Sequence, residues 1–233
     1  MRRSPRLPRR RHELPGRNLR FLRALKRNNR REWFEAHRGD YEAYVRQPMT
    51  AIVERLAVDL RGFAPELVAS PRISIHRIYR DTRFSDNKTP YKTNVAARFP
   101  PRALPKGEGA GVYFHVSPEG VWIGGGMYAP QPQELYAIRQ HISTHLKQFR
   151  AIVESPGFKK HLGALAGHTL QRVPRGFAKE HPAVEFLKFR QFIGGAEFRA
   201  SLATSPTFYQ TLLTVFREVT PLTRFLNAPL LKG

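Results

Sequence analysis

Residues 77–94 interleave basic, hydroxyl and aromatic side chains around a proline. The basic residues are Arg77, Arg80, Arg83, Lys88 and Lys92. Guanidinium and ammonium groups bind phosphate or carboxylate oxygens, and Ser85 and Tyr91 add a hydroxyl donor and an aromatic surface. The segment predicts a binding site for a phosphate-bearing or other anionic ligand. The expected partner is nucleic acid or a phosphate-bearing small molecule.

The spacing of the arginines leaves the geometry of this site open. Arg77, Arg80 and Arg83 recur every third residue, which would align them on a helix but sends them to different faces of a strand. If a strand ends near Arg80, the following loop can fold its cations back toward the strand end. The structural alternative is an internal lock, in which Arg77 and Arg80 form ion pairs that fasten the helical region to the sheet. The candidate acids for that lock are Glu32, Glu35 and Asp81.

A catalytic alternative assigns the same segment to an enzyme that acts on a small anionic substrate. Arg80 and Lys88 would hold the anion, and Asp81 or His76 would transfer a proton. A metal nuclease needs two carboxylates and a lysine near one cation, but Asp81 and Asp86 are only five residues apart around an expected turn. We expect no metal centre and no cofactor, and no complete catalytic constellation is identified.

Two further patterns favour structural interpretations. The glycine run 124–126 lacks the lysine of a P-loop and the spacing of a dinucleotide fingerprint. Consecutive glycines permit close backbone approach, a bulge, or a shallow floor under a ligand. His141 and His145 are four residues apart on an expected helix, but the glutamate of the zinc-protease pattern is absent, so we interpret them as polar-face residues.

The chain of 233 residues carries a formal net charge of +22 at pH 7. Such a charge attracts polyanions, although a compositional bias toward arginine would produce the same value. Residues 1–17 contain seven arginines, one glutamate and three prolines without apolar periodicity, which predicts a disordered basic arm. Subtracting the arm's net +6 from +22 leaves +16 on residues 18–233, which we expect to form one domain.

The absence of cysteine excludes disulfides and thiolate chemistry. No run approaches the roughly 20 apolar residues needed to span a bilayer, and no apolar segment of the signal-peptide kind follows the basic N-terminus. We therefore expect a cytoplasmic protein with no membrane partner. The oligomeric state is left open.

Helical periodicity dominates the first seventy residues. Asn18 is expected to cap a short helix, and Asn29 with Glu32 three places later resembles a capping box for a second helix. A third apolar pattern follows Asp40, and Pro48 is expected to kink or split it. After the middle of the chain, the spacing of apolar residues from 135 to 153 predicts one helix that packs on the sheet. Residues 155–182 are expected to form short helices joined by loops. Ser205 is expected to cap the final helix.

The alternation typical of strands begins after Pro71. Strands are expected at residues 72–79, 95–99, 111–116, 121–127 and within 186–193. Residues 117–120 have proline second and glycine fourth, which favours a hairpin turn. The predicted fold is α+β, with an antiparallel or mixed sheet from the middle of the chain covered by N-terminal and C-terminal helices.

Four motifs, in this order, resemble one protein family. They are Asn28-Asn-Arg-Arg-Glu-Trp-Phe34, residues 77–94, Gly124-Gly-Gly-Met-Tyr-Ala-Pro130, and Leu170-Gln-Arg-Val-Pro-Arg-Gly-Phe177 with His181-Pro182. Together they are similar to the bacterial conserved-hypothetical family called domain of unknown function 2461, across residues 18–227. The resemblance implies one cytoplasmic α+β domain and names no substrate, cofactor or catalytic residue. The family has an acid before the lysine of its Phe-Ser-x-Asp-Lys element, where this chain has Asn87.

Overall fold

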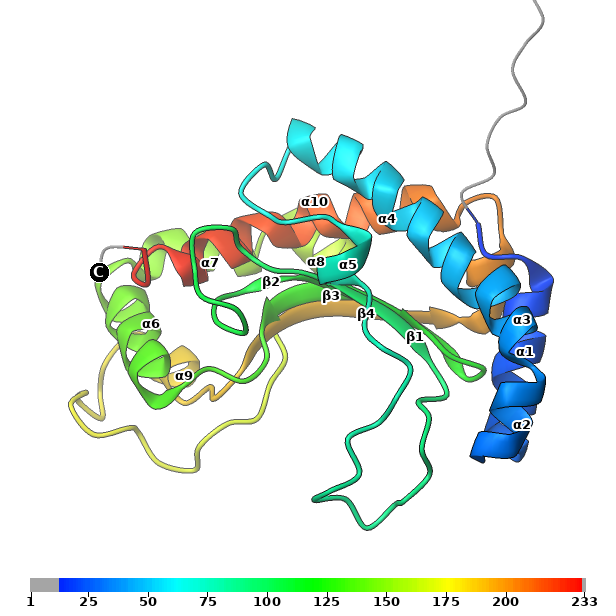
Figure 1. Ribbon diagram of the computed structural model, residues 1–233. Coiled ribbons are helices and arrows are strands. Elements are labelled where there is room, and N and C mark those ends of the chain that lie inside the picture. Colours follow the sequence, from blue (N-terminus) through cyan, green and yellow to red (C-terminus); the bar gives the residue numbers. More distant parts are fainter. Residues whose placement is uncertain (1–12, 232–233) are drawn as a thin grey trace, which may run out of the picture.

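The computed structural model describes residues 13–231 (Figure 1). The helices are α1 (Gly16–Arg27), α2 (Arg31–Ala36), α3 (Arg38–Tyr41), α4 (Gln47–Asp59), α5 (Pro71–Ser74), α6 (Pro132–Thr144), α7 (Leu146–Val153), α8 (Pro156–Leu162), α9 (Val184–Leu187) and α10 (Phe208–Asn227). Shorter segments are the π-helical η1 (Glu42–Arg46) and the 3-10 turns η2 (Leu60–Gly62) and η3 (Ala200–Thr204). The strands are β1 (Val95–Phe99), β2 (Gly111–Val116), β3 (Gly120–Met127) and β4 (Phe192–Arg199).

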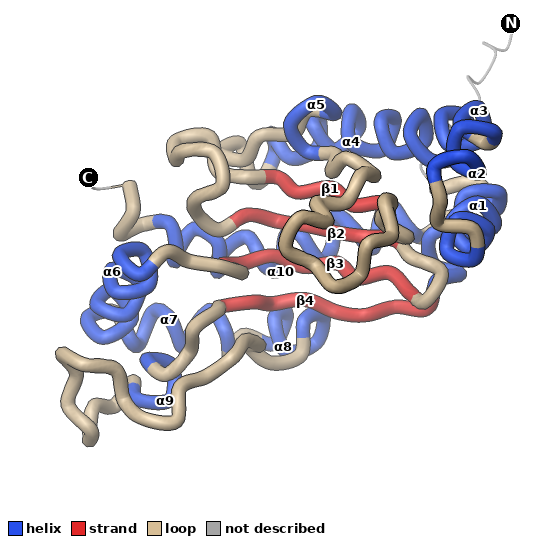
Figure 2. Tube along the Cα trace, turned by 60° about the horizontal axis from the view of Figure 1, so that its bottom comes forward, coloured by secondary structure: helices blue, strands red, loops and turns tan. Residues whose placement is uncertain are grey.

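The four strands form one antiparallel sheet in the order β1-β2-β3-β4 (Figure 2). The hairpin between β2 and β3 is closed at Ser117, whose hydroxyl accepts a hydrogen bond from the backbone N–H of Gly120 at 3.2 Å. Its register pairs Val116 with Val121, as expected from the turn residues between them. The prediction of an α+β fold with an antiparallel sheet is confirmed.

Alternation along β2 sends its apolar side chains to one face of the sheet. Val112, Phe114 and Val116 are fully buried there, and α10 packs on the same face. Phe216 of α10 lies 6.5 Å from Phe114, ring centre to ring centre. Figure 2 shows α10 behind the sheet, whereas no helix formed by residues 13–231 covers the front face. We call this front face, away from α10, the open face.

The other helices pack around the sheet rather than on the open face. Helices α1, α2 and α3 lie at one end of the strands, and α6, α7 and α9 lie at the other (Figures 1 and 2). Helix α4 reaches edge strand β1 through α5. In Figure 1 the sheet is a shallow arch with α10 and α4 above it and two long loops below it. The open face is therefore the inner face of this arch.

The predicted strand over residues 72–79 is wrong. Pro71 begins the short helix α5 instead, which suits its fixed backbone angle and missing N–H. The Ser74 hydroxyl accepts from the backbone N–H of Ser70 at 3.2 Å and helps to close this turn. Only single bridges follow, between Ile75 and Ala97 and between Tyr79 and Tyr91.

The predicted strand within residues 186–193 is placed too early. Residues 184–187 form α9, and β4 runs from Phe192 to Arg199. Gly194 and Gly195 lie inside β4, opposite Gly125 and Gly124 of β3. Glycine weakens the strand pattern of a sequence, so the glycine-rich half of β4 was not recognisable by alternation.

Helix ends also differ from the sequence-based expectations. Asn18 is inside α1 and buried, where its side chain donates to the carbonyl of Tyr44 at 3.0 Å. Arg30, not Asn29, precedes α2. The predicted helix over residues 135–153 breaks at His145 into α6 and α7, and α6 contacts α7 and α9. Thr207 precedes α10, with its N–H donating to the Ser205 hydroxyl.

Residues 1–12 of the predicted basic arm lie outside the described residues. In the rest of that predicted segment, Leu14 is fully buried, its N–H donates to the carbonyl of Ala203 at 2.9 Å, and α1 begins at Gly16. The folded part of the chain therefore starts before residue 18. No helix within residues 13–231 has the length and apolar character required to cross a membrane.

Candidate functional site: the ribbon and the open face

Residues 76–94 form a loop whose two extended arms are paired with each other and which projects from the sheet. We call this loop the ribbon. Its arms are joined by backbone hydrogen bonds from Arg80 N–H to Pro90 O at 2.9 Å and from Lys92 N–H to Ile78 O at 2.8 Å. At its base, His76 N–H donates to Ala96 O at 2.9 Å. Figures 1 and 2 both show the ribbon projecting from the open face, across the front of β1 to β3.

The ribbon is fastened to the helical end of the molecule through Tyr91. The side-chain amide of Asn29 donates to Tyr91 O at 2.9 Å, and Tyr91 N–H donates to the Asn29 side-chain oxygen at 3.0 Å. The Tyr91 ring stacks on Phe34 at 4.2 Å and is 2% exposed. Tyr91, a predicted ligand contact, is thus an anchor in the core and does not reach the surface.

Arg80 and Ser85 hold the tip of the ribbon together. Arg80 donates to the hydroxyls of Thr89 at 2.7 Å and Ser85 at 3.3 Å. The side-chain oxygen of Asn87 accepts from both the N–H and the hydroxyl of Thr89, at 3.0 and 2.8 Å. These two bonds from one short polar side chain close the turn at the tip.

Arg83 and Lys88, the other two cations of the tip, have partners within it. Arg83 pairs with Asp81 at 2.8 Å, and this contact lowers the pKa of the Asp81 carboxyl. Lys88 donates to Thr82 O at 3.0 Å. Phe84 is 95% exposed. Asp81, a predicted proton-transfer group, is thus held as a paired carboxylate on the surface.

The ion pairs expected for an internal lock are not seen among residues 13–231. Neither Arg77 nor Arg80 lies within salt-bridge distance of a carboxylate there, and the charge of Arg77 acts on Asp81 only at longer range. Glu35 pairs with Arg38 at 2.6 Å. The amide of Asn29 and the stack of Tyr91 on Phe34 fasten the ribbon.

His76 connects the base of the ribbon to an aromatic cluster on the open face. Its ring lies 5.8 Å from that of Tyr113 on β2. Tyr113 in turn lies 5.7 Å from His115 and 5.8 Å from Trp122 of β3. Because Tyr113, His115 and Trp122 occupy the positions that alternate with the buried ones, all three point away from α10.

Trp122 lies flat against a floor of glycine backbone. A Cβ on Gly195 of β4 would come within 2.4 Å of the indole Cζ2, and one on Gly124 would come within 2.7 Å of Cη2. Any side chain at either position would displace the ring, so both glycines are required for this arrangement. The glycine run of β3 therefore supports a tryptophan, with the indole between the backbone and solvent.

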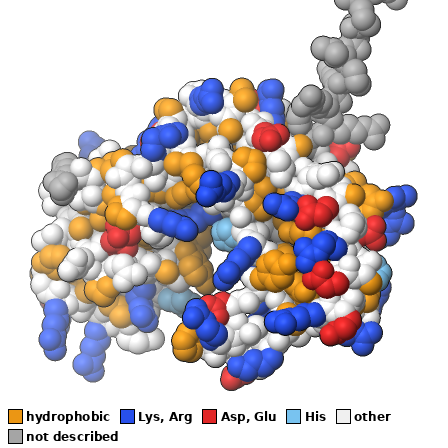
Figure 3. Space-filling view, in the orientation of Figure 1, with side chains coloured by type: hydrophobic (Ala, Val, Ile, Leu, Met, Phe, Trp, Pro, Cys, Tyr) orange, Lys and Arg blue, Asp and Glu red, His pale blue; other side chains and the backbone are white. Residues whose placement is uncertain are grey.

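Cations border this cluster. Lys92 donates to the backbone carbonyl of Arg77 at 3.0 Å, and loss of hydration together with the charge of Arg77 lowers the Lys92 pKa. Arg98 of β1 donates to Gly109 O at 2.8 Å. The nearby acid on β4 is Glu197, which faces His115. Figure 3, in the orientation of Figure 1 and so not looking onto the open face, shows Lys and Arg side chains spread over the side of the molecule that faces the viewer.

The protonation states of the cluster follow from its surroundings. Burial raises the pKa of Tyr113 to about 12, so its hydroxyl stays protonated at neutral pH and can donate a hydrogen bond. Loss of hydration, Lys92 and Arg98 lower the pKa of His76. Burial also lowers the pKa of His115, against the opposing charge of Glu197. Both imidazoles are therefore neutral at pH 7 without a ligand.

Sequence reasoning missed Tyr113, His115 and Trp122 as site residues. The available signal was that these three residues alternate with apolar residues in 111–116 and 121–127, so they point to the opposite face of the sheet. Because α10 packs on the apolar face, these aromatic side chains have no helix to pack against. That signal could not be used without knowing that one face of the sheet lacks a helix.

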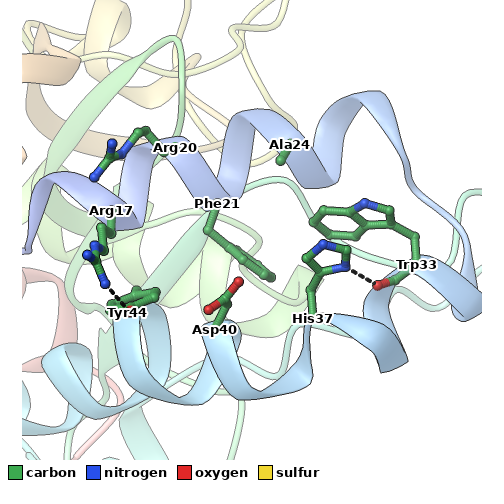
Figure 4. Close-up of a pocket in the computed structure, with 8 residues that line it drawn as sticks. All are labelled: Arg17, Arg20, Phe21, Ala24, Trp33, His37, Asp40 and Tyr44. Carbon is green, nitrogen blue, oxygen red and sulfur yellow. Dashed lines mark hydrogen bonds between the residues drawn. The ribbon is translucent and has the colours of Figure 1, made fainter.

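A separate depression of about 400 Å³ lies between α1 and the following helices (Figure 4). Its lining residues are Arg17, Arg20, Phe21, Ala24, Trp33, His37, Asp40 and Tyr44. The Trp33 and His37 rings stack at 4.1 Å, and His37 Nδ1 donates to the Trp33 carbonyl at 2.8 Å. Arg17 donates to the Tyr44 hydroxyl. The stacking and the hydrogen bonds fix these helices relative to one another.

The histidine of the His181-Pro182 motif contacts a serine, but its tautomer does not suit nucleophilic catalysis. Ala183 N–H donates to His181 Nδ1 at 3.0 Å, which leaves the proton of a neutral imidazole on Nε2. Nε2 therefore donates to the Ser143 hydroxyl, 2.8 Å away. A general base would need an unprotonated Nε2 at that hydroxyl. Across residues 13–231, no three potential metal ligands of the His, Cys, Asp or Glu type are grouped together.

These features define an α+β protein whose antiparallel sheet has helices on one face and an aromatic, cation-bordered surface with a projecting ribbon on the other. The family model for conserved hypothetical proteins called DUF2461 matches residues 17–225, and the chain belongs to this family. Searches of curated proteins and of solved structures gave no match.

Proposed function

We propose that the protein binds a phosphate-bearing ligand on the open face, beside the base of the ribbon. The observation that carries this proposal is the placement of Lys92, which is close enough to His76 to lower its pKa, while the His76 ring lies 5.8 Å from the Tyr113 ring. Within the described residues, neither Lys92 nor Arg77 lies within salt-bridge distance of a carboxylate, although the charge of Arg77 acts at longer range on Asp81. An ammonium group has three donors, and Lys92 uses one on the carbonyl of Arg77, which leaves donors for a ligand.

The neighbouring groups suit phosphate oxygens. The Tyr113 hydroxyl is a donor at neutral pH, and His76 and His115 can take up protons when an anion raises their pKa. The proposed site lies at the base of the ribbon, because at the tip Arg80, Arg83 and Lys88 already have partners within the loop. The proposed site thus includes part of the segment predicted from the sequence, together with side chains on the open face of the sheet.

Binding is favoured over catalysis by the state of Asp81. A proton-transfer role needs a carboxyl that can exchange its proton near neutral pH, whereas pairing with Arg83 lowers the pKa of Asp81. His76 is the remaining candidate for proton transfer, and its surroundings favour a neutral ring that an anion would protonate. The proposal is therefore a binding protein.

The test compares two lysine variants of equal charge. Lys92→Gln removes the proposed contact, and Lys147→Gln removes the same charge from the exposed surface of α7. Binding of pyrophosphate and of a short oligonucleotide to the full chain is measured by calorimetry at low salt. Because a hydrogen bond to a charged group is strong, we expect Lys92→Gln to weaken binding about 10-fold and Lys147→Gln to change it less than about 2-fold.

A third variant separates charge from folding. Lys92→Arg keeps the positive charge and is expected to restore most of the affinity, while the melting temperature of each variant reports whether the ribbon remains folded. Equal losses in Lys92→Gln and Lys147→Gln would mean that binding depends only on the overall charge. That result, or no binding of either ligand, would overturn the proposal.

A further inference from the structure

We infer that the ligand is a single-stranded nucleic acid whose bases stack on the rings of the open face, an inference that rests on the function proposed above. Trp122 provides the central ring of this surface. Its six-membered ring lies close to the backbone of Gly124 and Gly195, which limits the positions that the indole can take. The residue is on the face away from α10 and is only partly buried. An aromatic ring that is held in place and partly open to solvent is what a base needs in order to stack.

His115 adds a second ring on the neighbouring strand. The His115 and Trp122 rings are 11° from parallel, with centres 6.5 Å apart, and the two residues are directly paired between β2 and β3. Tyr113 follows on β2, 5.8 Å from Trp122 and tilted by 49° against it. Tyr128, just after β3, is 73% exposed and is close enough to Tyr113 to affect its pKa. The open face therefore offers several neighbouring rings on which bases could stack.

Positive charge lies on both sides of the rings. Arg77 and Lys92 are on the ribbon, on the β1 side. Arg199 of β4 is exposed and occupies the same face as Trp122, two residues beyond the Glu197 that pairs with it. Strands are about 4.8 Å apart, so β1 and β4, at the two edges of this sheet, are separated by about 14 Å. Cations at both edges would suit two or more phosphates along one chain.

The chemistry of stacking selects single strands over duplexes. In a duplex each base is covered on both faces by its neighbours, whereas an unpaired base can turn its face onto a side chain. The net charge of +22 adds a general attraction for the backbone but has no preference between paired and unpaired strands. A preference for single strands must therefore come from the ring surface.

Four labelled ligands of equal length separate these contributions in fluorescence anisotropy with the full chain. They are a deoxythymidine oligomer, a uridine oligomer, an abasic oligomer that keeps only sugar and phosphate, and a duplex. The basic N-terminal residues are the same in every measurement. Because stacking on an aromatic side chain contributes substantially to affinity per base, we expect the oligomers with bases to bind about 10-fold tighter than the abasic oligomer and the duplex.

Two substitutions at Trp122 make the test specific. Trp122→Leu keeps an apolar side chain but removes the ring plane, and we expect it to weaken binding of the base-containing oligomers about 10-fold while leaving the abasic oligomer unchanged. Trp122→Phe keeps an aromatic plane and is expected to retain most of the affinity. Circular dichroism and melting curves show whether the sheet is intact in both.

The failures of the two proposals are distinguishable. If the abasic and base-containing oligomers bind equally, and both depend on Lys92 but not on Trp122, the phosphate site stands and the stacking inference is overturned. A preference for the duplex would also overturn the stacking inference. If no oligomer depends on Lys92 beyond the effect of Lys147→Gln, the proposed function itself fails.

Discussion

Asn29 pairs with the backbone of Tyr91 through both atoms of its side-chain amide, at 2.9 and 3.0 Å. The amide takes the place that a neighbouring strand would occupy, because it offers one donor and one acceptor to one residue. The ribbon, which has few strand contacts of its own, is in this way joined to the start of α2. Residues of the Asn-Asn-Arg-Arg-Glu-Trp-Phe motif thus contact the segment 77–94 directly, although the two are far apart in the sequence.

Removal of this amide should loosen the ribbon. Asn29→Ala leaves the N–H and carbonyl of Tyr91 without partners in a partly buried position, so we expect a loss of about 1–3 kcal/mol in unfolding free energy. Asn28→Ala, next to it, loses a single bond to Ala24 O and is the matched control. Urea unfolding gives both values. Equal effects of the two substitutions would contradict the role assigned to Asn29.

Substitutions of Tyr91 should separate its ring from its hydroxyl. Tyr91→Phe keeps the stack on Phe34 and is expected to change stability and ligand affinity little. Tyr91→Ala removes a buried aromatic ring and should cost about 3–5 kcal/mol. A large loss of ligand affinity in a stably folded Tyr91→Phe variant would show that the hydroxyl contacts ligand after all.

Arg80→Ala should have only a small effect on stability. Its partners Thr89 and Ser85 are neutral hydroxyls, so we expect a loss of about 1 kcal/mol, compared with about 3 kcal/mol or more for breaking a buried ion pair. Thermal unfolding of Arg80→Ala decides between these values. A loss near the larger figure would restore the interpretation of Arg80 as part of an internal lock.

The open face should respond to pH in two opposite ways. The pKa values of His76 and His115 are lowered from 6.5, so the unfolded chain takes up protons first as the pH falls, and stability should decrease below about pH 6.5. A bound phosphate favours imidazolium, so ligand affinity should instead increase over the same range. Lys92 and Arg98 oppose protonation of His76, and Glu197 favours that of His115. Calorimetry from pH 5 to 8 with His76→Gln and His115→Gln should show a flatter dependence; an unchanged one would exclude these groups.

Gly195→Ala tests the glycine floor. Its Cβ would lie 2.4 Å from Cζ2 of Trp122, so the indole must move, and overpacking of this kind costs about 1–3 kcal/mol. Gly39→Ala, where a Cβ meets nothing within 4 Å, is the control. We expect Gly195→Ala alone to shift tryptophan emission and weaken oligonucleotide binding. Unaltered emission would mean that the ring is not seated on Gly195.

Local patterns predicted much of the fold. The strands at 95–99, 111–116 and 121–127 and the hairpin turn follow from alternation and turn chemistry, and the α+β class follows from their order. The strand within 72–79 failed because Pro71 begins a helical turn, and β4 was misplaced because its glycines face other glycines across the sheet. The first error comes from a local helical signal, the proline in the first turn, and the second from pairing across the sheet that no local pattern contains.

The candidate site was predicted only in part. Lys92 lies near His76 at the base of the ribbon, where we propose the site, whereas Tyr91 and Arg80 have internal roles. Whether a side chain of the ribbon faces solvent depends on contacts with α2 and with the loop itself. The aromatic half of the site depends on which sheet face α10 covers, a long-range property of the fold.

Trp122 emission provides the most direct measurement of the central claim. The chain has two tryptophans, so a Trp33→Phe variant leaves Trp122 as the single reporter on the open face. This variant is titrated with an unlabelled deoxythymidine oligomer at low salt, and binding is followed in parallel by calorimetry. If the open face binds single strands, Trp122 emission will be quenched with the same midpoint as the heat signal. Binding detected by calorimetry with no change in Trp122 emission would contradict the claim.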